Sequence, residues 1–183
     1  MPIIPLLGFD GYWVGVHDAD PRAIALYERH YSNKKPGEHR SGFLGRSERL
    51  VLMTLDGLAL FAWRLVLPPD CRRSSFFQRD KRSIRRDYDG RPPSRYFGGQ
   101  VGIMCSIFRN EGPVLSSTLI LEAETLAWRR WPGQRLFTYV WDAKVKSPNP
   151  GYCFKKASWT CCGRNKDGRL TVLEKWPHSA APA

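Results

Sequence analysis

The stretch from residue 100 to residue 141 constrains the fold more than any other part of the sequence. An apolar run at 100–108 leads into a polar loop at 109–113, a segment with helical spacing of apolar residues at 115–131, and a second apolar run at 135–141. A helix that connects two strands of one sheet makes those strands parallel, and the crossover is right-handed in almost all proteins. This stretch therefore predicts a strand–helix–strand unit at the centre of a sheet.

The segments on either side predict further elements. Runs at 49–55 and 58–66 enclose Asp56-Gly57, a dipeptide typical of hairpin turns. Upstream, Asp20-Pro21 combines an N-cap acceptor with a proline at the first helical position, so we expect a helix that runs toward residue 31. Downstream, a short amphipathic segment at 152–158 precedes an Asp167-Gly168 turn and a strand at 169–173.

We expect these elements to form one domain over residues 1–183, an α/β fold of the α+β type with a mixed sheet. Residues 1–19 have an irregular pattern, and residues 177–183 suit a frayed tail. Residues 71–95 stand out as an insertion within the domain, because nine Arg or Lys residues face only three Asp residues there.

The basic insertion suits a polyanionic partner. Arg and Lys side chains neutralise phosphates, and interleaved aromatic side chains can stack on bases. The whole chain agrees, with 29 Lys and Arg against 17 Asp and Glu, a net charge of +12 and a pI of about 9.8. We predict a nucleic-acid interface, and the alternative is a solvated loop without a ligand. The candidate DNA-binding residues are Arg72, Arg73, Arg79, Lys81, Arg82, Arg85 and Arg86.

The apolar runs and the cysteines indicate a compartment. No run approaches the about 20 apolar residues that cross a bilayer, and residues 1–9 lack the basic start of a signal peptide. Five cysteines without a Cys-x-x-Cys pair argue against a disulfide framework and a zinc ribbon. We therefore expect a reducing cytoplasm and no membrane partner. If the adjacent Cys161 and Cys162 lie in a strand, we expect one buried and one exposed side chain.

Two sites near the central unit carry candidate chemistry. Ser116 and Ser117 lie in the first turn of the helix predicted at 115–131, where free backbone N–H groups and hydroxyls can hold an anion. The alternative is that one of them caps the helix. Asp142 follows the strand at 135–141, at the strand end where ligands of open α/β sheets gather. Its alternative is a surface carboxylate paired with Lys144.

Two further sites depend on aromatic residues. His30 is a candidate base or metal ligand, and Tyr31 ionises near neutral pH only beside strong positive charge such as a metal ion. Tyr152 is a third candidate. For all three, the alternative is an ordinary aromatic residue with its polar atom satisfied.

Several short segments together resemble one family. They span 28–32, 106–112 with 115–117, 135–142 and 149–159, and they keep the family's order between about residues 22 and 175. This set resembles the Mom family of phage DNA-modification proteins, and the element order resembles the GNAT acyltransferase fold. The resemblance implies an enzyme that converts adenine in double-stranded DNA to N6-carbamoylmethyladenine. This modification shields phage DNA from host restriction enzymes, which places the protein in the host cytoplasm.

The resemblance also implies an active centre with iron. Its His-Tyr pair, Asp and Tyr correspond to His30, Tyr31, Asp142 and Tyr152 as metal ligands. Imidazole, carboxylate and phenolate suit iron as ligands. The implied catalytic residues are Tyr31, Asp142, Tyr152 and Ser117, and the implied cofactor-binding residues are Arg109, Asn110, Ser116 and Ser117.

The loop at 109–115 departs from the ordinary GNAT pattern. A basic, glycine-rich loop binds the coenzyme A pyrophosphate in that fold, whereas this loop has one glycine and an acidic Glu111 that would repel the pyrophosphate. The donor is therefore left open between acetyl-CoA and another acyl or glycinamide donor. Trp63, Tyr96 and Phe97 are candidates to hold a flipped base. The oligomeric state is also left open, a dimer included.

Two other function classes stay open. The first is a GNAT-type N-acyltransferase that acts on another amine, such as a modified base, tRNA, a protein or a small molecule. The second is a basic nucleic-acid-binding module without catalytic activity. The net charge of +12 fits all three readings.

Overall fold

The computed structural model describes residues 11–33, 37, 42–44, 47–66, 100–145, 147–165 and 167–177. The predicted basic insertion at 71–95, with all seven candidate DNA-binding residues, lies outside these ranges. So do Tyr96, Phe97 and residues 178–183 of the predicted tail.

Within the described ranges, seven strands form one mixed sheet, as the sequence pattern predicts for a mixed α/β fold. The strands follow each other across the sheet in the order β1-β2-β3-β4-β5-β7-β6. Only β4 and β5 are parallel neighbours, and the helix between them in the chain is α4. The strands are β1 Trp13–Gly15, β2 Arg49–Thr54, β3 Ala59–Val66, β4 Gly102–Asn110, β5 Leu136–Trp141, β6 Thr160–Arg164 and β7 Leu170–Lys175. The helices are α1 Pro21–Glu28, α4 Ser116–Arg130 and α5 Tyr152–Lys156.

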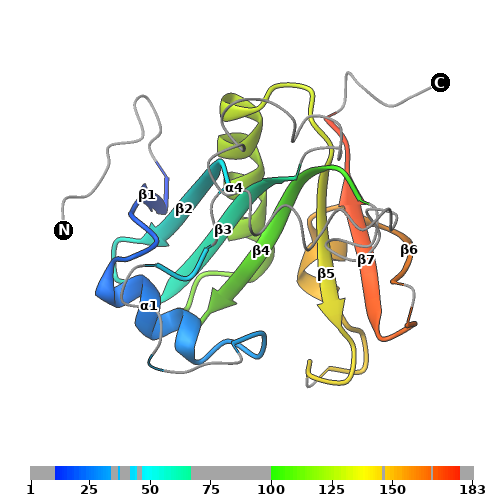
Figure 1. Cartoon of the computed structure of the whole chain (residues 1–183), viewed down its shortest axis with the longest axis horizontal. Helices are drawn as coiled ribbons and strands as arrows, with labels where there is room; N and C mark the ends of the chain where they lie inside the picture. The colour runs from blue at the N-terminus through cyan, green and yellow to red at the C-terminus, as the bar shows by residue number, and fades with distance from the viewer. Residues whose placement is uncertain are drawn as a thin grey trace, which may run out of the picture.

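The helices cover opposite faces of the sheet (Figure 1). Helix α4 buries apolar side chains at the predicted helical spacing, and the cluster that they form also includes Phe154 of α5. The buried α4 residues are Leu119, Ile120, Ala123, Leu126 and Ala127. Helix α1 buries its apolar side against β2, β3 and β4 on the other face. Burial of this apolar surface is the main force that holds the layers together.

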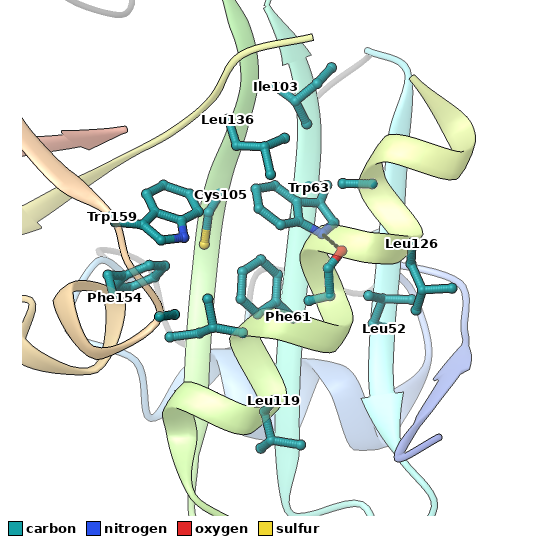
Figure 2. Packing of buried hydrophobic residues seen from close by; sticks show 14 of the residues in the cluster. Leu52, Phe61, Trp63, Ile103, Cys105, Leu119, Leu126, Leu136, Phe154 and Trp159 are labelled. Carbon is teal, nitrogen blue, oxygen red and sulfur yellow. Dashed lines mark hydrogen bonds between the residues drawn. The ribbon is translucent and has the colours of Figure 1, made fainter. Parts of the chain in front are cut away.

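Trp63 belongs to the core, so its prediction as a base-holding aromatic is wrong. The residue is fully buried, and its Nε1 donates to the Ala123 carbonyl of α4 at 3.0 Å. Figure 2 shows Trp63 beside Phe61, with Trp159 and Phe154 farther along the same layer. A side chain packed on all sides and bonded through its one polar atom has no free face for a ligand.

The local start and turn signals form as predicted. Asp20 caps α1 by accepting a hydrogen bond from the Arg22 N–H at 2.9 Å, and Pro21 opens the helix. Gly57 has a φ of +72°, which glycine adopts without strain, and its N–H donates to the Thr54 carbonyl at 2.8 Å.

The pattern analysis missed two short strands at the sheet edges. Strand β1 lies within 1–19, which the sequence pattern treats as irregular, and β6 contains the paired cysteines. Cys161 and Cys162 are both exposed, which contradicts the expectation of one buried side chain. The reason is a bulge: Cys161 pairs with Leu173 and Gly163 with Val172, so Cys162 is the extra residue.

Strand β4 extends farther than predicted. Arg109 and Asn110, assigned to a loop in the sequence analysis, pair with Leu60 and Ala59 of β3. Pairing with a neighbouring strand keeps these polar residues extended, and the apolar pattern alone does not reveal it.

A bulge in β4 separates it from β5. Trp63 pairs with Cys105 and Ala62 with Ile107, so Ser106 is the extra residue. The last parallel pair joins Cys105 to Thr138, whose hydroxyl donates to the Cys105 carbonyl at 3.0 Å. Beyond this point the two strands diverge toward their carboxyl ends (Figure 1). Bulges bend strands and commonly lie beside active sites.

Candidate active site

An ion-pair cluster fixes the turn after α1 against the end of β4. Both Arg29 and Arg109 bind the Glu111 carboxylate, at 2.7 Å and 2.5 Å. Arg109 also donates to the Arg29 carbonyl at 2.5 Å. These contacts hold the pKa of Glu111 well below its usual range, at about 2. The acidic residue that would repel a pyrophosphate is therefore paired with two arginines.

His30 is buried just beyond this cluster. Its Nδ1 accepts a hydrogen bond from the Ser32 N–H at 3.2 Å and lies 2.8 Å from the Ser32 hydroxyl. The Phe108 backbone also interacts with the ring. Burial and the nearby Arg109 charge lower the pKa of His30 to about 4. The imidazole is therefore neutral at physiological pH.

Tyr31 reaches the place where β4 and β5 diverge. Its ring stacks on His30, with centroids 4.3 Å apart. The Trp141 backbone at the end of β5 hydrogen-bonds to its oxygen, and Asp142, Cys105 and Cys153 act on it electrostatically. Burial is the main reason that the pKa of Tyr31 is raised, and the Asp142 charge acts in the same direction. Tyr31 is therefore a neutral phenol that can donate a hydrogen bond.

Asp142 lies at the end of β5, where the sequence analysis placed it. Its Oδ2 accepts a hydrogen bond from the Thr171 hydroxyl at 2.9 Å and pairs with Arg164 at 2.9 Å. Its Oδ1 is buried and has no hydrogen-bond partner among the described residues. The partner is thus Arg164 rather than Lys144, whose ammonium lies over the Trp141 ring. An acceptor left buried without a partner costs about 1–3 kcal/mol, so the surroundings hold it in place.

The start of α4 is organised by Asn110. Its amide nitrogen donates to the Val114 carbonyl at 2.7 Å and to the Ser116 hydroxyl at 3.1 Å, and its oxygen accepts from the Gly112 N–H at 2.9 Å. The N-cap residue Leu115 provides no side-chain cap. The predicted role of Arg109, Asn110, Ser116 and Ser117 in holding a donor stays a prediction.

Tyr152 opens α5 and is 51% exposed. The ammonium of Lys156 lies 5.5 Å from the centre of its ring. Gly151 before it has a φ of +74°, and a Cβ there would come within 2.5 Å of a Leu173 methyl group. The Asn-Pro-Gly turn therefore needs glycine, and it packs the start of α5 against β7.

The structure brings part of the predicted site together. Tyr31 stacks on His30, and the Asp142 charge acts on Tyr31, although these residues come from segments far apart in the sequence. Tyr152 opens the helix that also carries Cys153, another neighbour of Tyr31. Sequence reasoning assigned no role to Ser106, Thr171 or Arg164.

Ser106 could have been noticed within the segments that resemble the Mom family, and its buried hydroxyl has no partner in the described part of the chain. Thr171 and Arg164 have no sequence signal. Their place beside Asp142 follows from the strand order β5-β7-β6 alone.

One ring nitrogen of His30, Nδ1, is engaged by the Ser32 N–H and hydroxyl. Within the described residues, no group of three or more His, Cys, Asp or Glu side chains is placed to hold a metal ion. Iron held by His30, Tyr31, Asp142 and Tyr152 stays a prediction, and we route no chemical step through it.

None of the helices in the described ranges has the length and apolar character of a membrane span. The chain matches no protein-family model, no curated protein and no solved structure.

Proposed function

We propose that this protein is a transferase that modifies the N6 amine of adenine in double-stranded DNA, with carbamoylmethyl as the transferred group. The observation that carries the proposal is the buried Asp142 Oδ1 without a described partner, on a carboxylate whose charge also acts on Tyr31. The resemblance to the Mom family, with a GNAT-like arrangement of β4, α4 and β5, supplies the substrate and the group.

The chemistry needs a proton acceptor, because the exocyclic amine of adenine is a poor nucleophile. In the proposed step, N6 forms a bond to the methylene carbon of a donor that carries a leaving group. The bond from that carbon to the leaving group breaks, and the leaving group takes the electron pair. One N6 proton passes to Oδ1 of Asp142, acting as general base.

Tyr31 has a separate role in this scheme. Its raised pKa keeps the phenol protonated, so it can donate a hydrogen bond to charge that develops on the donor. The target base must leave the helical stack to reach these groups. The basic insertion at 71–95 would hold the DNA phosphates, which stays a prediction.

Nucleoside mass spectrometry tests the proposal. Cells that express the protein should contain deoxyadenosine with a carbamoylmethyl mass increment. Asp142→Asn should abolish the product, while the purified variant still binds DNA. Asp167→Asn is the matched control, since this exposed carboxylate pairs with Arg169 at 3.7 Å in a surface turn. Normal modification by Asp142→Asn would refute the site assignment, and an unmodified genome with soluble wild-type protein would refute the function.

A GNAT-type N-acyltransferase on another amine is the second candidate. The specific observation in its favour is that α4 starts just beyond the diverging end of β4 and lacks a side-chain cap. Backbone N–H groups at such a helix start can hold an anionic donor. The same measurement separates the two, because this function predicts an acetyl increment or a modification outside adenine.

A further inference from the structure

The cross-strand register places two side chains beside Asp142. Strand β7 lies between β5 and β6, and its residue Thr171 pairs with Val140 of β5 and with Arg164 of β6. Residues directly opposite in neighbouring strands point to the same face of the sheet. Thr171 and Arg164 therefore approach the carboxylate from a single row, and both contact the same oxygen, Oδ2.

Both partners are themselves fixed. Thr171 is 8% exposed within β7. Arg164 ends β6, and its second guanidinium nitrogen donates to the Gly168 carbonyl of the hairpin turn at 2.7 Å. That turn is closed by the Gly168 N–H, which donates to the Asn165 carbonyl at 2.9 Å. The carboxylate is thus bound by a buried hydroxyl of β7 and by a guanidinium that is 58% exposed but is also bonded to the hairpin turn.

The two carboxylate oxygens consequently differ. Oδ2 has a neutral donor and a charged donor, whereas Oδ1 is buried without a described partner. If the carboxylate rotated by half a turn, Oδ1 and Oδ2 would exchange places with no chemical change. What matters is that two contacts to one oxygen hold the plane of the group, so that the other oxygen stays without a described partner.

We infer that Thr171 and Arg164 are positioning residues, which orient the Asp142 carboxylate through one oxygen and keep the other as the proton acceptor for the substrate amine. This inference rests on the proposed function. A misplacement of about 1 Å in a reacting group can cost about 100-fold in rate.

Removal of the Thr171 hydroxyl is the sharpest test. Thr171→Val keeps the shape and the β-branch but cannot bind Oδ2, and we expect modified deoxyadenosine to accumulate about 10- to 100-fold more slowly per molecule of protein. Thr171→Ser restores the hydroxyl and should return the rate to near the wild-type value. DNA binding and the free energy of unfolding should stay close to wild type in both.

The matched control is Thr160→Val, in the same β6–β7 hairpin, where the hydroxyl lies 3.5 Å from the Glu174 carbonyl and not beside Asp142. For the ion pair, Arg164→Gln should slow modification, whereas Arg169→Gln at the exposed turn should not. A normal rate in Thr171→Val, or a Thr171→Ser variant as slow as Thr171→Val, would overturn the inference.

A wild-type protein that modifies no base would refute the proposed function but not the positioning of Asp142, which can be tested separately. Crystal structures of wild type and Thr171→Val then give the answer. We expect one carboxylate orientation of Asp142 in wild type and a rotated or split orientation in the variant. An identical carboxylate in both structures would show that Thr171 does not position it.

Discussion

The two ends of β7 hold two carboxylates in different ways. At one end, Lys175 donates to Oε2 of Glu124 at 2.5 Å, and Trp159 donates to Oε1. Glu124 is 1% exposed, so α4, β7 and the chain before β6 meet at a buried, fully bonded group. At the other end, Thr171 and Arg164 bind one oxygen of Asp142 and leave the second without a described partner.

The difference separates a carboxylate that is satisfied within the fold from one that keeps an unsatisfied oxygen, which we propose as functional. A buried charge is tolerated when an opposite charge and hydrogen bonds satisfy it, and Glu124 meets that condition. A buried oxygen without a partner lowers stability and is kept only where the fold imposes it. Such unsatisfied groups cluster at sites where a substrate completes the bonding, which is why we place the chemistry at Asp142.

The largest expected effect is on stability, at the end of β7 where Lys175 binds Glu124. Lys175→Met removes the ammonium and leaves the buried Glu124 charge with the Trp159 donor, so we expect the free energy of unfolding to fall by about 3–5 kcal/mol. Urea denaturation followed by circular dichroism measures this change. Lys144→Met, at an exposed lysine, is the control and should change little. A loss below about 1 kcal/mol would mean that the pair contributes no more than a surface ion pair.

The second effect concerns how the stability of the protein depends on pH through His30. His30 has a pKa of about 4 in the folded protein against 6.5 for the free side chain, so the unfolded chain binds its proton more readily. The stability that depends on a neutral His30 is fully present above pH 6.5 and is lost as the pH falls toward 4. The free energy of unfolding falls by on the order of 3 kcal/mol over this range.

His30→Gln should remove this part of the acid destabilisation. Glu111, whose pKa is lowered from 4.5 to about 2, loses stability below about pH 4.5 in both proteins, so the difference between them reports His30. Urea denaturation at neutral pH and near pH 4 checks the difference. An equal loss of stability in wild type and His30→Gln would place the proton elsewhere.

The smallest expected effect sharpens the comparison most directly. In Asp142→Asn, the amide oxygen can still accept from Thr171 and Arg164, while the NH2 group takes the place of the unpartnered oxygen. We therefore expect the free energy of unfolding to change by less than about 1 kcal/mol, even though modification is lost. Glu124→Gln, measured beside it, should be clearly less stable than wild type. Equal decreases in the free energy of unfolding in the two variants would remove the distinction between the two ends.

Much of the fold follows from local patterns. The strands at β2, β3, β4, β5 and β7 and the helices α1, α4 and α5 lie where apolar spacing and turn residues predict them. The short edge strands β1 and β6 were missed, because three and five residues with few apolar side chains provide too little periodicity. Trp63 was misassigned because the sequence alone does not show whether an aromatic side chain is buried in the core or exposed at a binding surface.

The candidate site was predictable only in part. The segments that resemble the Mom family suggested His30, Tyr31 and Asp142. The fold stacks Tyr31 on His30 and brings Tyr31 under the influence of the Asp142 charge, and the role of the three residues stays a prediction. The bulge at Ser106 and the contacts of Thr171 and Arg164 with Asp142 were not predictable.

The sequence by itself determined most of the helices, the longer strands and the turns, because a cap, a Gly turn or an apolar period depends on residues within one or two turns of chain. Only the tertiary structure decided which carboxylate is satisfied. That outcome depends on the strand order β5-β7-β6, which seats Thr171 and Arg164 beside Asp142, and on the bulge where β4 leaves β5. Sheet order and bulges arise from packing between distant segments, and no local pattern of residues encodes them.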